Sequence, residues 1–409
     1  MEEKKKTYDL GIDLNDAFAM VSYYQPDMDE PDTVSAVAGS ELYHIPAILA
    51  RRQNLGLWYY GDEAKRMAKT SEVICVDSLL WRAVNHEVIS VGEENYEAVE
   101  LLALFLRRVI ELPQKLGSPG AMGTLVLSVE RLNKENMEVF WRVASLLSIP
   151  PDKFMVTDHK ESFYYYALSQ KEELWLHKVF LFECTGDTVS SYELKRDRRT
   201  KPQVVSIHEN SRASIEGERD EAFLRLLQKS FEGHMISTVY LVGDGFDGGW
   251  MEQSLNYLCR GRRAFLGKNL FSKGACYAAA ARGRDWPCIY MGENEMKFNL
   301  SLKVRDKGTM AFHNLVSAGR NWFEAMGECE VILSGTGSVD FWKQLPNSRE
   351  AKIETLELTD LPPRPDKTTR VRILAKPVSD DRIEIEIRDL GFGEFFRGTD
   401  KIWKYTMSM

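Results

Sequence analysis

The chain has 409 residues, of which 44% are hydrophobic and 28% charged, and its formal net charge is −8. This length predicts two or three domains rather than one core. The negative charge argues against a nucleic-acid-binding protein, because phosphate contacts need a basic face. Two local basic clusters, at 195–201 and 260–263, are interpreted as solvated ends of elements, with an acidic partner as the alternative.

Membrane and metal chemistry are also disfavoured by the sequence. No uncharged apolar run reaches the roughly 20 residues needed to span a bilayer, so we expect a cytoplasmic protein with no membrane contact. The six cysteines include no C-x-x-C pair, and the seven histidines lack the spacing of a transition-metal site.

The first predicted unit along the chain is a hairpin. Two β-rich runs, 7–14 and 17–24, flank a polar break at Asn15 and Asp16. Strand and helix signals then alternate, and the pattern of strand, polar break and strand returns at 177–195. This repetition predicts a duplicated α/β domain with a cleft between its halves.

Acidic residues end the first strand of both hairpins, at Asp13 and Glu183. Between the two hairpins, the sequence predicts a helix over 94–112 and another that begins at Asn133. Glu183 and Gly243 are 60 residues apart, and that interval contains the signal of one helix.

A glycine-rich loop follows the next strand signal. Gly243, Gly245 and Gly248 match G-x-G-x-x-G, the dinucleotide fingerprint between a strand and a helix. That fingerprint needs an acidic residue at the end of the following strand, but the next strand signal ends in Gly267 and Lys268. The sequence therefore lacks the acidic residue that would contact the ribose, which argues against a dinucleotide site.

Strand signals dominate after residue 290. The run RIEIEIRD alternates polar and apolar residues strictly, which is typical of a strand with one solvent-exposed face. The segment LPPRPDK at 361–367 is interpreted as a rigid connector between two strands. We therefore expect an α/β domain over residues 1–290 and a β-sandwich over 291–409.

This order of elements resembles the actin and heat-shock ATPase superfamily, and specifically the seventy-kilodalton heat-shock chaperones of the DnaK type. The two phosphate loops of these chaperones are similar to LGIDLNDAFAMVSYY and FLFECTGDTVS. Their adenosine loop is similar to VYLVGDGFDGGW followed by FSKGACYAAA. Their β-sandwich substrate-binding domain is similar to ETLELTDLPPRPDKTTRVRILAKPVSDDRIEIEIRD.

The resemblance implies a fold of two related lobes, one of them lacking a helical subdomain, followed by the sandwich. It also implies candidate nucleotide-binding positions at Asp13, Asn15, Asp16, Gly186, Asp187, Thr188, Gly243, Asp244 and Gly245.

Several departures from the family pattern argue against ATP turnover. Asn15, Asp16 and Ala17 replace the glycine and threonine of the first loop, and Asp16 adds a carboxylate where phosphate would lie. The second loop keeps one glycine, Gly186. The family's catalytic lysine falls at Leu79, which cannot neutralise phosphoryl charge.

We therefore expect a degenerate heat-shock-like protein that binds a protein or peptide partner without ATP turnover, with no catalytic residue and no required cofactor. One alternative is a divergent chaperone ATPase that binds ATP and Mg²⁺, in which Asp13 and Glu183 hold the metal through waters. Another is an actin-like assembly or scaffold, since the oligomeric state stays open. The resemblance implies candidate peptide-binding residues at Met310, Phe312, Leu315, Val316, Trp322 and Phe323, with the core of the sandwich as their alternative place.

Overall fold

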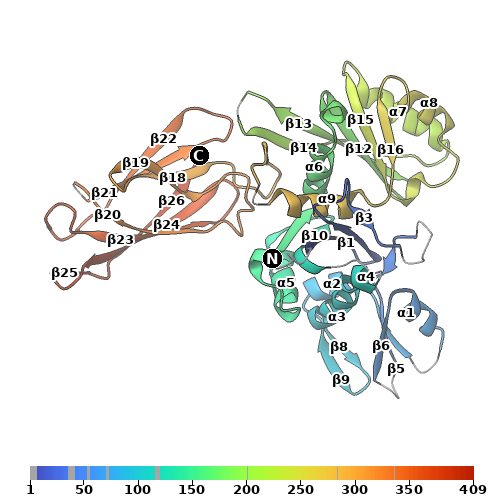
Figure 1. The fold of residues 1–409 in the computed structure, drawn as a ribbon, viewed down its shortest axis with the longest axis horizontal. Helices are drawn as coiled ribbons and strands as arrows, with labels where there is room; N and C mark the ends of the chain where they lie inside the picture. The colour runs from blue at the N-terminus through green and yellow to red at the C-terminus, as the bar shows by residue number, and fades with distance from the viewer. Residues whose placement is uncertain are drawn as a thin grey trace, which may run out of the picture. The chain divides into compact units, whose positions relative to one another are not determined.

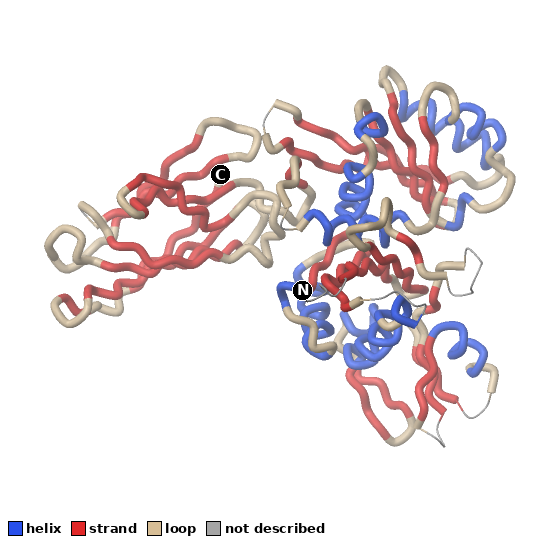
Figure 2. Tube along the Cα trace, viewed as in Figure 1, coloured by secondary structure: helices blue, strands red, loops and turns tan. Residues whose placement is uncertain are grey.

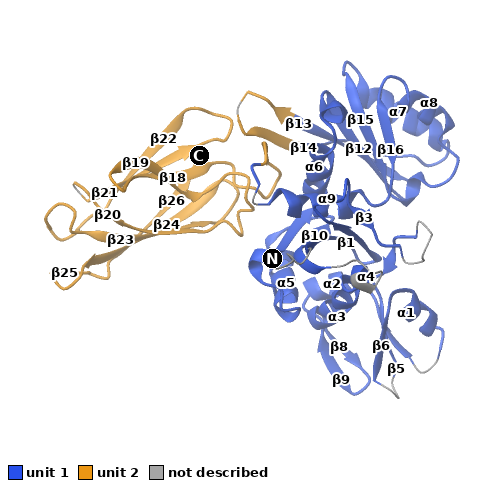
Figure 3. Cartoon of the chain, in the orientation of Figure 1, with its two compact units in different colours: residues 1–195, 207–285 blue, residues 196–206, 286–409 orange. Residues whose placement is uncertain are grey.

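The computed structural model describes residues 7–35, 42–52, 56–70, 73–115, 120–199, 201–282, 284–335 and 337–409. The chain divides into two compact units, residues 1–195 with 207–285 and residues 196–206 with 286–409 (Figure 3). The main part of the second unit thus begins at residue 286, five residues before the predicted position 291. The second unit also includes residues 196–206, which connect two strands of the other unit's sheet. Thr200, in the basic cluster at 195–201, lies outside the described residues.

The first sheet of unit 1 contains the predicted hairpin, which is confirmed. Its order is β11-β10-β1-β2-β3, and β4 also pairs with β2. Figure 1 labels β1, β3 and β10 of this sheet. β1 pairs antiparallel with β2 and parallel with β10, which pairs parallel with β11. The strands are β1 (Thr7–Leu14), β2 (Phe18–Tyr24), β3 (Asp32–Thr33), β4 (Ile45–Pro46), β10 (Ala121–Val129) and β11 (Phe154–Asp158).

The second sheet repeats this local pattern. Its order is β16-β15-β12-β13-β14-β17, with β12 antiparallel to β13 and parallel to β15. The first strand of each hairpin therefore has a parallel neighbour on its other side, and the second hairpin is confirmed. The strands are β12 (Lys178–Thr185), β13 (Thr188–Asp197), β14 (Gln203–Ser214), β15 (Ile236–Val242), β16 (Arg263–Leu266) and, in unit 2, β17 (Cys288–Tyr290).

Short strands and helices complete unit 1. The helices are α1 (Gly61–Met67), α2 (Leu79–Val84), α3 (Ala98–Ile110), α4 (Leu112–Lys115), α5 (Lys134–Leu146), α6 (His159–Ser169), α7 (Arg219–Phe231), α8 (Glu252–Leu258) and α9 (Leu270–Ala281), with 3-10 turns η1 (Pro151–Lys153), η2 (Glu172–Trp175) and η3 (Asp244–Phe246). The remaining strands are β5 (Leu49–Arg52), β6 (Leu57–Tyr60), β7 (Val73–Val76), β8 (Val88–Val91) and β9 (Glu94–Glu97).

Three helix predictions can be compared with these bounds. α5 begins after Asn133, whose side chain accepts a hydrogen bond from the Asn136 backbone, as predicted. α3 is shorter than the predicted 94–112, because residues 94–97 pair with β8 instead. Among the described residues between Glu183 and Gly243, α7 is the one α-helix, also as predicted.

Two helices, α6 and α9, pack closely enough to require glycine. A Cβ at Gly274 in α9 would lie 2.1 Å from the carbonyl oxygen of Ser162 in α6. A Cβ at Gly11 in β1 would lie 2.2 Å from the carbonyl oxygen of Ser272 in α9. α9 therefore contacts both β1 and α6 through backbone, which holds the end of β1 near the start of α6.

Unit 2 is strand-rich, as predicted (Figure 2). One sheet has the order β19-β18-β21-β22, and the other has β20-β23-β24-β25 with β26 also on β24. The strands are β18 (Asn299–Asp306), β19 (Thr309–Val316), β20 (Gly327–Ile332), β21 (Ser338–Gln344), β22 (Ala351–Glu357), β23 (Arg370–Pro377), β24 (Arg382–Phe392), β25 (Phe396–Arg397) and β26 (Ile402–Ser408).

Both sheets of unit 2 contribute to one hydrophobic core. Leu300 and Phe341 come from the first sheet, and Val371, Ile385 and Ile387 from the second, and all five are fully buried or nearly so. The alternation in RIEIEIRD therefore places one face of β24 in this core. In the described part of the whole chain, no helix combines the length and apolar character needed to cross a membrane.

Candidate functional site

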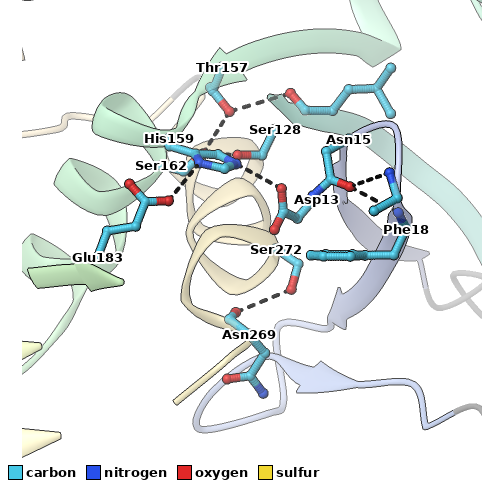
Figure 4. Close-up of polar contacts among 12 residues, drawn as sticks. Asp13, Asn15, Phe18, Ser128, Thr157, His159, Ser162, Glu183, Asn269 and Ser272 are labelled. Carbon is cyan, nitrogen blue, oxygen red and sulfur yellow. Dashed lines mark hydrogen bonds and ion pairs between the residues drawn. The ribbon is translucent and has the colours of Figure 1, made fainter. Parts of the chain in front are cut away.

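A histidine joins the two acidic strand ends of unit 1. His159 Nε2 lies 2.8 Å from Asp13 Oδ1, and His159 Nδ1 lies 3.8 Å from Glu183 Oε1. Figure 4 shows the imidazole between the two carboxylates. Asp13 comes from β1 and Glu183 from β12, so this contact links the two sheets. Sequence reasoning predicted the two acids but missed the histidine.

The position of His159 follows from the end of β11. Asp158 is the N-cap of α6, and its side chain accepts a hydrogen bond from the Glu161 backbone. His159 is therefore the first helical residue, beside the carboxyl ends of β1 and β10. Its ring stacks on Phe271 of α9, with centroids 3.8 Å apart and an angle of 7°. The sequence signal that could have identified His159 is its place directly between a parallel strand and a helix.

The charge of His159 is set by these two acids. Burial is the largest influence on its pKa and lowers it, but Asp13 and then Glu183 oppose burial and raise the pKa of His159 to about 10. The imidazole is therefore a cation at neutral pH. Asp13 is nearly buried, with 5% of its side chain exposed, so this cation is its principal counter-ion.

Buried hydroxyl groups fix the elements around the histidine. Ser162 Oγ of α6 lies 2.7 Å from Ser128 Oγ of β10 and 2.9 Å from Thr157 Oγ1 of β11. On the other side, Ser22 Oγ of β2 lies 2.8 Å from Ser272 Oγ of α9. Because each of these hydroxyls is small and has a partner, the helices approach the sheet closely at these points.

The first predicted phosphate loop makes its own hydrogen bonds. Asn15 Oδ1 accepts from the backbones of Ala17 and Phe18, at 2.9 Å each, which closes the turn between β1 and β2. Asp16 Oδ1 accepts from the Trp81 backbone at 2.8 Å, at the start of α2. Leu79, where the expected resemblance would place a catalytic lysine, is 1% exposed and belongs to the core.

The second predicted phosphate loop packs against the glycine loop. A Cβ at Gly243 would lie 2.2 Å from the Cys184 carbonyl oxygen, and a Cβ at Gly245 would lie 2.2 Å from Cys184 Sγ. The same Gly245 Cβ would be 2.8 Å from the carbonyl oxygen of Gly186. These two glycines therefore allow contact between the end of β12 and the loop after β15, a structural reason for glycine that requires no nucleotide.

The packing of Gly245 gives a direct prediction. Gly245→Ala should destabilise the protein by about 2 kcal/mol, because the new methyl group overpacks against Cys184. Gly249→Ala is the matched control, since a Cβ there meets nothing within 4 Å, and should change stability by less than about 0.5 kcal/mol. Urea unfolding of both variants measures the difference. Equal stability of the two variants would contradict the packing role.

Two further cations lie beside these loops, and sequence reasoning missed both. Arg219 Nη2 donates to the Gly245 carbonyl at 2.9 Å, lies 3.8 Å from Asp187 Oδ1, and its guanidinium stacks over Trp250. Lys268 Nζ lies 3.2 Å from Asp244 Oδ1 and also pairs with Asp247. The carboxylates added to the predicted nucleotide site thus have partners within the protein.

The remaining loop residue, Thr188, opens β13. It pairs with Thr185 across the hairpin, and Gly186 adopts a left-handed conformation in the turn between them. For the metal alternative, no group of three or more acidic, histidine or cysteine side chains among the described residues has the arrangement of a metal site. The histidine stands between Asp13 and Glu183, the two acids that would hold the ion.

The predicted peptide-binding residues of unit 2 separate into three pairs. Met310 and Phe312 in β19 are 54% and 60% exposed. Leu315 and Val316 are 7% and 2% exposed and belong to the core, so they cannot form a surface contact. Trp322 and Phe323 are half-buried and stack edge to face, and Trp322 packs against the core.

The exposed pair belongs to a larger apolar surface on the outer face of the sheet. Phe312 contacts Trp342 of β21 edge to face, with ring centroids 5.2 Å apart. Trp342 pairs across the strands with Ile353 of β22, which is 52% exposed. We call Met310, Phe312, Trp342 and Ile353 the β19 face. Lys303 Nζ lies 5.6 Å from the centre of the Trp342 ring.

The other sheet of unit 2 has a different outer surface. Arg372 on β23 pairs with Glu328 and Glu330 on β20, at 3.3 and 3.0 Å. Lys404 on β26 pairs with Glu386 on β24 at 3.5 Å. Rows of opposite charges across strands are typical of a solvated face. Ile332 on β20 and Ile402 on β26 are also exposed on this sheet, so what distinguishes the β19 face is that Phe312 and Trp342 contact each other.

Comparison with known families adds a classification but no activity. Residues 30–293 match the C-terminal region of DUF5716, a family of unknown function. This match covers more than half of the chain, so the chain belongs to the DUF5716 family. Residues 295–409 match DUF8552, a domain of unknown function. No curated protein matches the chain.

Proposed function

We propose that this protein is a degenerate heat-shock-like protein that binds an apolar segment of a partner protein on its β19 face and does not turn over ATP. The observation that carries the proposal is the exposure of Met310, Phe312 and Ile353 around the half-buried Trp342 on one sheet. Contiguous apolar surface is rare on monomeric proteins away from interaction sites. The salt-bridged face of the other sheet supports a specific role for this surface.

The proposed relation to the actin and heat-shock superfamily has support from the architecture. Each of the two larger sheets contains an antiparallel hairpin, and the first strand of each hairpin pairs in parallel with a later strand. Each such strand carries an acid near its end, Asp13 or Glu183, and the two acids meet through His159. We infer a duplicated actin-like fold from this repetition, with the strand-rich unit 2 after it.

The inferred lack of ATP turnover has support from the contacts of the loops. Magnesium would need the carboxylates that His159 already pairs with, and a second cation beside the imidazolium is repelled. The β-phosphate and γ-phosphate would need backbone N–H groups free of side chains, but Asp16 and Asp187 lie in the loops. The residues present therefore do not fit a magnesium nucleotide, and we derive no step through one.

Binding of the β19 face is tested with a reduced, carboxymethylated unfolded protein as the probe. The Met310→Ser/Phe312→Ser variant should bind it about tenfold more weakly than the unmodified chain, because apolar area is lost from the contact. Phe395→Ser is the control, since Phe395 is 89% exposed in the same unit but lies outside the β19 face. Equal loss in both variants, or no binding by the unmodified chain, would reject the proposed surface.

Nucleotide binding is tested separately by calorimetric titration of the full chain with ATP and Mg²⁺. We expect no binding tighter than about 10 μM. A tighter constant, together with phosphate release, would reject the proposed loss of turnover and favour the divergent ATPase instead.

A further inference from the structure

The edge strand β16 of unit 1 has an exposed apolar surface of its own. β16 is the last strand of its sheet and pairs on one side with β15. Phe265 and Leu266 are 43% and 58% exposed. By contrast, the edge strand β11 of the other sheet is buried along most of its length. Exposed edges are templates for added strands, and natural proteins usually cover or shorten them.

The backbone of β16 offers hydrogen-bonding groups on its open side. The Gly267 backbone donates to the Leu241 carbonyl on β15 at 3.1 Å. In a parallel pair, alternate residues direct both backbone groups toward the same neighbour. Phe265 therefore faces β15 with its backbone, and the N–H and C=O groups of Ala264 and Leu266 face outward. The strand can accept a new neighbour without losing a bond to β15.

The side chains of the edge are held in place. Phe265 stacks on Tyr240 of β15, with centroids 5.5 Å apart and an angle of 18°. Tyr240 is 3% exposed and is itself packed against Tyr166 of α6. Ala264 packs on the opposite face, against the core below α7 and α8. An incoming strand would therefore meet Phe265 and Ala264 side chains that are already packed, which lowers the entropic cost of binding.

Positive charge precedes this edge in the chain. Arg260, Arg262 and Arg263 form the basic cluster at 260–263, and no carboxylate pairs with any of them in the described chain. Arg262 stacks over Phe231 and Tyr257, at 4.6 and 5.0 Å from the ring centres. At the other end of β16, Lys268 is neutralised by two aspartates. The unpaired charge is thus confined to the beginning of the strand.

We propose that the open edge of β16 binds an acidic, extended segment of a partner protein as an added β-strand. Main-chain hydrogen bonds to Ala264 and Leu266 supply affinity, and carboxylates beside Arg260 and Arg263 supply selectivity. Apolar residues of the segment cover Phe265 and Leu266. This site is separate from the β19 face.

A purely protective role for the arginines makes the opposite prediction. Charged residues on edge strands often prevent self-association. If they serve only that purpose here, charge-neutral variants will aggregate and the unmodified chain will bind no peptide. If they recruit a partner, their reversal will abolish binding of an acidic peptide.

The test uses the full chain and two fluorescent seven-residue peptides, one with alternating glutamate and valine and one with alternating lysine and valine. Fluorescence anisotropy should show binding of the glutamate peptide that weakens with added salt, and about tenfold weaker binding of the lysine peptide. Arg260→Glu/Arg263→Glu should lose the glutamate peptide and gain the lysine peptide. A gain of function of this kind does not arise from misfolding.

A second variant tests the backbone. Leu266→Pro removes an outward N–H and no bond to β15, so it should weaken binding about tenfold while circular dichroism stays unchanged. Arg199→Glu, in the other basic cluster, and Met310→Ser/Phe312→Ser should both bind the glutamate peptide normally. Absence of glutamate-peptide binding, equal binding of both peptides, or loss only in the β19-face variant would each overturn the proposal.

Discussion

Replacement of His159 by glutamine should lower the free energy of unfolding by about 3 kcal/mol, because it leaves Asp13 buried without its counter-ion. Glutamine retains a hydrogen-bond donor but carries no charge. The loss should appear in urea unfolding at pH 7 as a lower midpoint with an unchanged slope. This change also breaks the contact between the ends of β1 and β12, so we expect faster amide exchange in α6.

The pH dependence of stability provides an independent check on His159. Its pKa is raised from 6.5 to about 10 in the folded chain, so the folded state binds the extra proton across this interval. The stabilisation is therefore complete below pH 6.5 and is lost as the pH rises toward 10, with a slope of up to roughly 1.4 kcal/mol per pH unit. The His159→Gln variant should lack this slope.

Two further variants test whether the loss of stability in His159→Gln comes from the charge pair or from a general disturbance of the fold. Asp13→Asn introduced into His159→Gln should recover part of the stability, because the unpaired carboxylate is removed. His313→Gln, at an exposed histidine of unit 2, should be neutral. An unchanged pH slope in His159→Gln would show that the imidazole does not carry the charge proposed for it.

Replacement of Arg364 by methionine should cost about 3 kcal/mol, a loss of similar size in unit 2. Arg364 Nη1 and Nη2 donate to the two oxygens of Asp389, at 2.7 and 2.8 Å, and the two side chains are 4% and 0% exposed. Asp389 also accepts bonds from the Gly391 backbone and from Thr399. Methionine fills the space of Arg364 but leaves this carboxylate uncompensated.

The double replacement Arg364→Met/Asp389→Asn should cost less than the sum of the two single replacements. Lys401→Met serves as the control, because its partner Asp360 is exposed and such pairs contribute little. Thermal unfolding of the unmodified chain, the two single replacements and the double replacement measures the coupling between Arg364 and Asp389. Additive losses would mean that the pair makes no specific contribution.

The lowered pKa of Asp389 predicts a second pH dependence of stability. Burial alone would raise the pKa of Asp389, but Arg364 and the backbone donors outweigh it and hold the pKa well below the ordinary value of 3.8. The stabilisation is therefore present above pH 3.8 and is lost as the pH falls further. Unit 2 should unfold in acid, and Arg364→Met should shift this transition to higher pH.

The sequence by itself determined the elements with strong local signals. Alternation and a two-residue polar break predicted both hairpins, and the capping residue Asn133 predicted the start of α5. Such signals act over a few residues, so they need no knowledge of distant contacts. The strand-rich character of unit 2 followed in the same way from RIEIEIRD and its neighbours.

Local signals failed where pairing with another segment decided the outcome. Residues 94–97 fit the helical stripe that continues into α3, but they form β9 because β8 offers them a partner. Leu315 and Val316 follow Phe312 in one strand, yet only the packing of two sheets decides which of them is buried.

The site depended most on tertiary structure. Asp13 and Glu183 were predicted from their places at strand ends, but His159 comes from a third segment and contacts both only after the two sheets have packed on α6 and α9. The glycines of VGDG suggested a nucleotide loop in the sequence. The structure gives Gly243 and Gly245 a different reason: a Cβ at Gly243 would meet the Cys184 carbonyl oxygen, and a Cβ at Gly245 would meet the Cys184 sulfur.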